Sequence, residues 1–219
     1  MKWISKTSLI LLWAVTANIM LGQNKPWLKP YTDWSDKDVQ RILSESPWAQ
    51  KQDEAPYDTF NAKAQGSKFQ LIYRFLSSKP IRQALYRSVE LDRRSTQGQI
   101  AAARKFMDGK YEDSIVISVT YADPQYPHQA SLKFSKPTTG LLRNNTYLTL
   151  ANGRRVFLEE YQPPGQDGLG AKFIFARFVG GKPFIGPGDR TVRFDAESLN
   201  IHNILFKVAD MMLDGVLEY

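Results

Sequence analysis

The sequence predicts an α+β protein: an antiparallel β-sandwich-like domain with two or three helices and an N-terminal tryptophan-rich arm. Three observations carry this prediction. A strand-like run at 69–76 passes through a turn into an amphipathic helix that begins near Lys79. After Gly109, short β-branched and aromatic runs alternate with turn signals. Few helical patterns follow that point, so the helices must cover one face or one end of a curved antiparallel sheet or sandwich.

The start of the chain has the form of a secretory signal peptide. Lys2 and Lys6 precede a short apolar run at 9–15, and small residues follow it. An uncleaved anchor helix is the alternative, although the run is short for a membrane span. We expect a periplasmic or secreted protein with no transmembrane span after cleavage. The predicted parts are residues 1–22 as the signal peptide, 23–66 as an arm with a short helix and a linker, and 67–219 as the α+β sandwich-like domain.

Composition excludes several classes of activity. The 219 residues include no cysteine, so disulfides, thiol catalysis, thiolate metal sites and a lipid-attachment cysteine are all ruled out. The net charge is +7, but basic residues are scattered among acids, and Arg93-Arg94 and Arg154-Arg155 are the densest pairs. This pattern is typical of a solvated surface, so we expect no nucleic-acid partner.

The arm carries a short predicted helix. Ser35 is a good N-cap, Asp38 supplies the acid three residues later, and Trp34 and Val39 stand where a hydrophobic staple would join them. The helix should end at Ser46, because a proline follows.

Three tryptophans, Trp27, Trp34 and Trp48, are the candidate binding residues. Flat aromatic rings stack on sugar faces or on a protein partner. The same rings could instead anchor the arm to its own domain, because each buries a large apolar area. The anchor is the favoured interpretation, since the staple already occupies one ring.

Further elements follow in order. The polar segment 51–68 predicts a linker. The strand at 69–76 has Phe69, Leu71, Tyr73 and Phe75 on one face. Two helices with a break near Ser95, or one kinked helix, then lead to Gly109. The other predicted elements are strands at 115–121, 130–134, 146–150, 154–161, 171–178, 191–194 and 204–208, a hairpin turn at Asn152-Gly153, a wide connection at 163–170, and turns at Gly180-Gly181 and Asp214-Gly215.

Two runs carry a family resemblance. The stretch FLSSKPIRQALYR at 75–87 and the stretch KPWLKPYTDWSDKDVQRILSESPWAQ at 25–50 resemble a group of uncharacterised exported bacterial proteins, commonly from Acidobacteria, described as GWxTD-domain proteins. The tetrad that names the group is absent, and 32–35 reads TDWS. The resemblance implies export and brings no catalytic residues.

Candidate chemistry is sparse. His128 and His202 have no sequence neighbours that suggest a triad. Glu159 and Glu160 are adjacent on a strand and should point to opposite faces. Asp210, Asp214 and Glu218 match no calcium loop. We therefore predict no catalytic residue, no metal and no cofactor.

The sequence favours an exported, non-enzymatic interaction or structural module of the bacterial envelope, with an envelope protein as its partner. One alternative is a carbohydrate- or lipid-binding module, in which aromatic rings bind a glycan or lipid. A further alternative is an envelope hydrolase whose carboxylates are brought together by folding.

Overall fold

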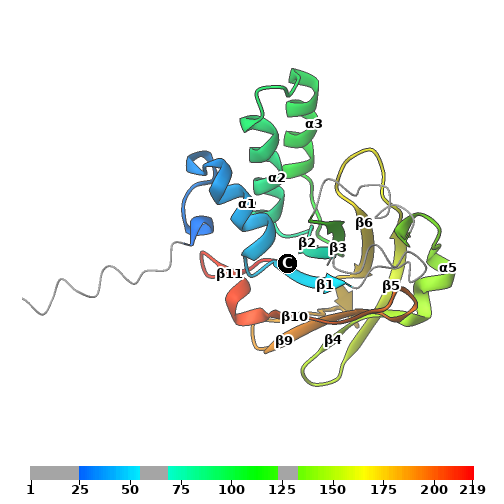
Figure 1. Ribbon diagram of the computed structural model, residues 1–219. Coiled ribbons are helices and arrows are strands. Elements are labelled where there is room, and N and C mark those ends of the chain that lie inside the picture. Colours follow the sequence, from blue (N-terminus) through cyan, green and yellow to red (C-terminus); the bar gives the residue numbers. More distant parts are fainter. Residues whose placement is uncertain (1–24, 55–68, 123–132) are drawn as a thin grey trace, which may run out of the picture.

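The computed structural model describes residues 25–54, 69–122 and 133–219 (Figure 1). The predicted signal peptide and His128 lie outside the described residues. An eight-stranded antiparallel sheet has the order β1-β2-β3-β6-β5-β4-β9-β10, and β7-β8 and β11-β12 form two small hairpins.

The helices are α1 (Asp36–Glu45), α2 (Lys79–Leu91), α3 (Gln97–Met107) and α5 (Thr139–Leu142). The strands are β1 (Ala49–Glu54), β2 (Phe69–Phe75), β3 (Ser114–Tyr121), β4 (Thr146–Leu150), β5 (Arg155–Gln162), β6 (Ala171–Ala176), β7 (Phe178–Val179), β8 (Lys182–Pro183), β9 (Thr191–Ala196), β10 (Ile201–Lys207), β11 (Met212–Leu213) and β12 (Val216–Leu217).

The sheet curls until it nearly closes on itself. Its two edge strands approach each other, and Gln52 of β1 donates a side-chain hydrogen bond to the carbonyl of His202 on β10 over 3.5 Å. Across the interior, the rings of Phe75 and Phe206 lie 4.7 Å apart. The predicted α+β, sandwich-like class is confirmed, with one strongly curved sheet enclosing a single aromatic core.

Helices cover one half of this sheet, which we call the covered half (β1, β2 and β3). Figure 1 shows α1, α2 and α3 gathered beside these strands. Outward-facing Ile72 and Val116 are only 6% and 5% exposed. Arg74 also points outward, and its guanidinium donates to the Leu43 carbonyl at the end of α1 over 2.6 Å. Burial lowers the pKa of Arg74 to about 10.

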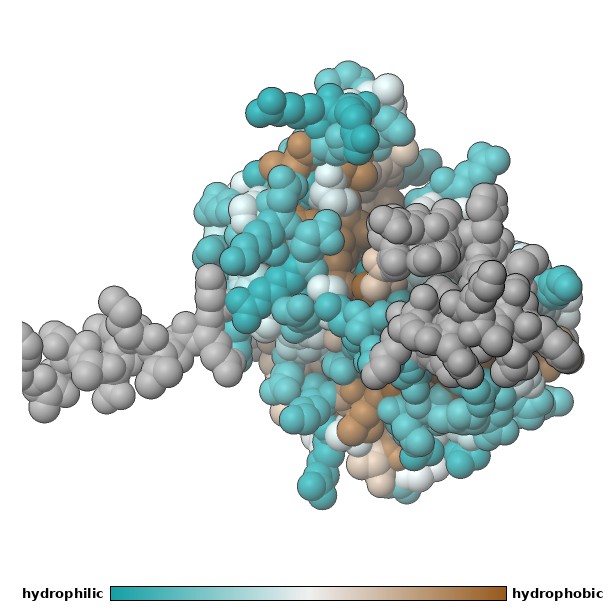
Figure 2. All heavy atoms as spheres, in the orientation of Figure 1, coloured by the Kyte–Doolittle hydropathy of each residue, from teal (hydrophilic) through white to brown (hydrophobic). Residues whose placement is uncertain are grey.

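The other half, which we call the exposed half (β5, β4, β9 and β10), keeps side chains in contact with solvent on its outer face. Phe157 and Leu205 are each 47% exposed. Figure 2 shows mainly hydrophilic side chains on this side of the molecule, with a small apolar spot over β9 and β10. Strand β6 pairs with both β3 and β5, so it joins the two halves.

Local signals predicted several elements correctly. Ser35 and Asp38 form a capping box at the start of α1. Helices α2 and α3 are separate, with the break where it was expected. The β4–β5 hairpin turns at Asn152-Gly153, where the Gly153 φ of +85° suits glycine. The wide connection and the turns at Gly180-Gly181 and Asp214-Gly215 also lie between paired strands.

Two predictions of secondary structure were wrong where the structure describes the residues. Residues 51–54, expected to begin a linker, belong to β1, and 55–68 lie outside the described residues. This edge strand is polar, and its backbone pairing with β2 holds it in place, so it lacks the apolar alternation of a half-buried strand. Lys133 and Phe134, expected in a strand, are helical, because Phe134 turns inward to fill the core; 130–132 lie outside the described residues.

Candidate functional site

Two of the three candidate tryptophans belong to the interior. Trp34 and Trp48 are 2% and 0% exposed. The Trp34 indole N–H donates to the Pro26 carbonyl over 2.8 Å, and that of Trp48 donates to the Glu218 carbonyl over 2.7 Å. Because buried indoles with satisfied donors have no face to offer a ligand, the binding role predicted for these two residues does not fit the structure. Both anchor the arm.

Trp27 differs from its neighbours because its ring is only partly buried. It meets the Trp48 ring edge to face at 6.1 Å and lines a groove of about 430 Å³. This Trp27 groove is built from four parts of the chain: the arm, the end of α1, the start of β1, and the end of β10 with the turn after it. Its polar side chains include Lys25, Glu45, Gln50, Lys207 and Asp210.

A second hollow, of about 340 Å³, lies on the outer face of the exposed half. We call it the Thr149 hollow. Thr149 lines it between Arg155 and Arg193, the residues that face it on the two neighbouring strands. Leu205 lines both this hollow and the Trp27 groove, so the two are neighbours.

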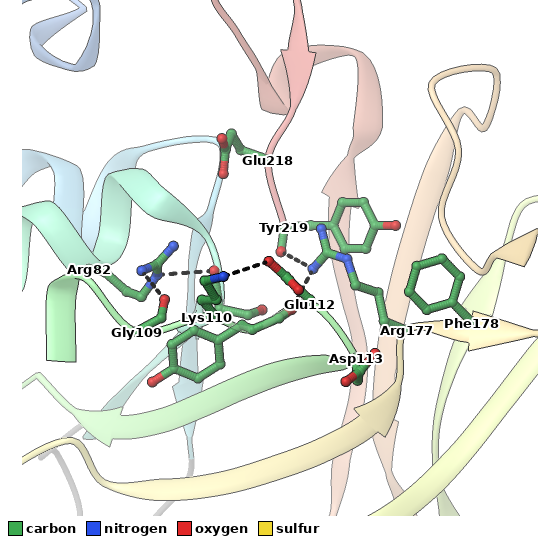
Figure 3. Close-up of a pocket in the computed structure, with 11 residues that line it drawn as sticks. Arg82, Gly109, Lys110, Glu112, Asp113, Arg177, Phe178, Glu218 and Tyr219 are labelled. Carbon is green, nitrogen blue, oxygen red and sulfur yellow. Dashed lines mark hydrogen bonds and ion pairs between the residues drawn. The ribbon is translucent and has the colours of Figure 1, made fainter. Parts of the chain in front are cut away.

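A third pocket, of about 640 Å³, lies elsewhere (Figure 3). Arg82 and Arg177 stand on opposite sides of it, with the Lys110–Glu112 ion pair between them. The Arg82 guanidinium lies 5.2 Å from the centre of the Tyr111 ring. The Arg177 guanidinium lies 3.9 Å from the centre of a second tyrosine ring, that of Tyr219.

Both arginines of this pocket are engaged in holding the chain. Arg82 donates to the carbonyls of Met107 and Gly109, which end α3. Arg177 donates to the main-chain oxygen of Tyr219 over 2.7 Å. Burial lowers the pKa of Arg82, against the opposing effect of nearby acids and Tyr111. Because the carboxylates of Glu112, Asp113 and Glu218 balance the cations, we interpret this pocket as a structural junction.

The remaining candidates are dispersed. His202 is exposed on β10. The side chains of Glu159 and Glu160 are both exposed. The prediction that they point to opposite faces was wrong, because the β5–β6 register shifts between Leu158 and Glu160 and breaks the alternation of side chains.

The three C-terminal acids also separate. Asp210 lines the Trp27 groove, Asp214 occupies a turn, and Glu218 accepts a hydrogen bond from the Lys79 amide at the start of α2 over 3.2 Å. Within the described ranges, no three His, Cys, Asp or Glu side chains come together as a metal-binding group.

The sequence singled out Trp27 and Asp210 but did not connect them or indicate the strand residues of the groove. Gln50, Leu205 and Lys207 come from strands that meet only because the sheet curls, and none of them stands in a motif. Arg155 was noted as part of a basic pair, yet its position beside Thr149 depends on strand register.

No helix among the described residues is long and apolar enough to cross a membrane. The chain matches no protein-family model, no curated protein and no solved structure.

Proposed function

We propose that the protein is an exported, non-enzymatic module that binds a glycan in the Trp27 groove. The observation that carries this proposal is the contrast among the three arm tryptophans: two are buried anchors, while Trp27 lines a groove. An aromatic ring supplies an apolar surface for a sugar face. The surrounding carboxylates, amide and ammonium groups supply acceptors and donors for sugar hydroxyls.

The groove also suits a binding role by its construction. The side chain of Trp27 packs against Trp48, which is fixed in the core, so the ring is held before a ligand arrives. A preorganised site avoids part of the entropy cost of binding. Export is the context in which a glycan ligand is expected, and it rests on the signal-peptide pattern of residues 1–22.

Affinity electrophoresis tests the proposal. Protein produced from the full 219-residue sequence is run through native gels that contain xylan, galactomannan, mixed-linkage β-glucan or polygalacturonate, and is also mixed with insoluble chitin and peptidoglycan. We expect retention by at least one of these polymers. Retention should be lost in Trp27→Ala and largely kept in Trp27→Phe, which preserves a flat ring.

Leu28→Ala is the matched control, since Leu28 adjoins Trp27 and is 66% exposed. Its retention should equal that of the wild type. Thermal unfolding of each variant separates loss of the ring from loss of the fold. If no polymer of the panel retards the wild type, or if folded Trp27→Ala is retained as strongly as the wild type, the proposal is overturned.

A carboxylate-dependent glycan hydrolase is the second candidate. The specific observation in its favour is that Glu45 and Asp210 line the same groove as Trp27. Glycosidases use two carboxyl groups on either side of the bond that breaks. Reducing-end release from a retained polymer, lost in both Glu45→Gln and Asp210→Asn, would establish hydrolysis. Retention without any release would leave the binding module as the function.

A further inference from the structure

We propose that the glycan site extends from the Trp27 groove across the exposed half to the Thr149 hollow, and that the hollow takes the carboxylate of an acidic polysaccharide. This inference rests on the proposed function and names the class of its ligand: a chain of uronic acid residues.

Strand register creates the hollow. Thr149 on β4 is paired with Arg155 on β5 and with Arg193 on β9. Directly paired residues point to the same face of a sheet, so the short threonine lies between two long side chains. Neighbouring strands are about 4.8 Å apart, which puts the two arginine backbones roughly 10 Å from each other. A carboxylate in the hollow would therefore have an arginine on the strand to either side of it.

The charged side chains that line the hollow are all cationic. Among the described residues that line it, two are arginines and none is an aspartate or glutamate. Arg193 donates through Nε to the buried carboxylate of Asp195, two residues along β9, over 2.8 Å, and this bond orients the guanidinium. The Asp195 carboxylate in turn accepts a hydrogen bond from the backbone N–H of Asn203 over 2.9 Å. A guanidinium has five N–H donors, so Arg193 keeps others for a ligand.

Arg155 is positioned by a ring. Its guanidinium lies 4.4 Å from the centre of the Tyr147 ring, which also packs against Phe157 at 5.7 Å. The Tyr147 hydroxyl donates to the Glu197 carboxylate, which fixes the ring from its far end. Because a stacked arginine has lost much of its freedom already, it can bind an anion at a smaller entropy cost.

The floor of the hollow has an unused polar atom. Thr149 is 8% exposed, and within the part of the chain that the structure describes its hydroxyl has no hydrogen-bond partner. Buried hydroxyls are usually partnered, so this one is unusual, but its oxygen is itself buried beneath the surface of the hollow; the two arginines therefore carry the argument for an anion.

The hollow and the groove form one path. Leu205 lines both, and Lys207, which lines the groove, is paired with Thr191, which lines the hollow. From β10 to β5 the path crosses three strand spacings, or about 14 Å, which is the length of a short oligosaccharide. Trp27 would hold a sugar face at one end, and the two arginines would bind a carboxylate at the other.

Polygalacturonate and its fully methyl-esterified form test this path, because they share one backbone and differ in charge. We expect the wild type to bind the acid polymer more tightly than the ester. Arg155→Gln should reduce affinity for the acid polymer by about tenfold, the effect of losing a charged hydrogen bond, and should leave affinity for the ester unchanged. Raising NaCl should weaken acid binding more in the wild type than in this variant.

Arg154→Gln is the matched control, since it removes the same charge from the adjacent residue, whose guanidinium lies over Phe184 at 5.6 Å, outside the hollow. Its affinity for both polymers should equal that of the wild type. Equal affinity of the wild type for acid and ester, or no effect of Arg155→Gln on acid binding, would overturn the inference.

The two proposals fail in different ways. If Trp27→Ala abolishes glycan binding while Arg155→Gln binds the acid polymer normally, the groove stands alone and the extension is wrong. If Arg155→Gln weakens acid binding while folded Trp27→Ala does not, the continuous path is wrong and the proposed role of Trp27 fails with it.

Discussion

The covered and exposed halves of the sheet share one interior but have opposite outer faces. In the covered half, Ile72 and Val116 point outward and are nearly as buried as the core, and Arg74 on the same face contacts the end of α1. In the exposed half, the equivalent outward positions hold Arg155, Phe157 and Leu205, all open to solvent. The outer face of the covered half therefore contributes to the stability of the fold, and the outer face of the exposed half is where we propose that a ligand binds.

Polar residues follow the same division. Arg74 of the covered half gives its guanidinium hydrogen bonds to a helix end and to Thr120. Arg155 of the exposed half, in the part of the chain that the structure describes, has no carboxylate within ion-pair distance. Arg74 therefore holds the structure together, whereas the guanidinium of Arg155 is available to an anionic ligand.

The largest expected loss of stability comes from a substitution at Gly170, where β6 joins the two halves of the sheet. Gly170 precedes β6 with φ of +77°, and an added Cβ would lie 2.2 Å from the Val119 carbonyl oxygen of β3. Gly170→Ala should lower the free energy of unfolding by about 4 kcal/mol, through left-handed strain and a backbone clash. Urea denaturation followed by circular dichroism measures the change.

Gly168→Ala is the control for that clash. Gly168 has φ of +70° but nothing within 4 Å of the added carbon. Only the strain of about 1 kcal/mol should remain. Equal losses in the two variants would contradict the close approach of β6 to β3.

Truncation on each outer face compares the two halves directly. Ile72→Ala should cost about 3 kcal/mol, because the side chain is only 6% exposed and its removal leaves a cavity. Phe157→Ala removes a larger side chain from the exposed half yet should cost less than about 1 kcal/mol, since the ring is 47% exposed. The same denaturation measurement applies, and a reversed order would show that the outer faces are misassigned.

Removal of the Ser35 cap on α1 should have a smaller effect on the free energy of unfolding, and this effect should depend on pH. Ser35→Ala should cost about 1 kcal/mol at pH 7. The hydrogen bond from the Ser35 hydroxyl lowers the pKa of Asp38 from its ordinary 3.8, so this stabilisation is present above pH 3.8 and is lost as the pH falls through the lower folded value.

Unfolding at several pH values checks this sign. The difference between wild type and Ser35→Ala should narrow below pH 3.8. A difference that instead widens in acid would mean that the carboxylate does not act through the cap. Asp36→Asn, which changes a neighbouring acid outside the capping box, is the control.

The smallest effect concerns the pocket between Arg82 and Arg177. The Lys110–Glu112 pair is 3.8 Å long, and its side chains are 83% and 75% exposed. Lys110→Ala should therefore change the free energy of unfolding by less than about 0.5 kcal/mol. It should also leave glycan binding unaltered, because this pocket is part of the structural junction. A loss of binding would move the ligand site to this pocket.

Local signals in the sequence were sufficient for the elements that depend on neighbours in the chain. The capping box of Ser35 and Asp38 and the hairpin at Asn152-Gly153 each need only a few adjacent residues. Strand β1 could not be predicted, because its pairing with β2 is what makes a strand of a polar segment.

The candidate site shows the same limit more strongly. Trp27 was recognisable as an unusual residue, but its exposure depends on Trp48 being buried against Glu218, 170 residues away. The two arginines of the Thr149 hollow meet through register across three strands. Long-range pairings of this kind leave no periodic trace in the residues that they bring together.

Hydrogen–deuterium exchange of the full chain with and without polygalacturonate tests whether the ligand binds on the exposed half, because it reports both halves of the sheet at once. The account predicts slower exchange in residues 25–28, in the β4–β5 hairpin and in β9–β10, with no change in α2 and α3. Protection confined to 77–82, 107–113 and 177–178, around the Arg82 pocket, or no protection anywhere, would contradict it.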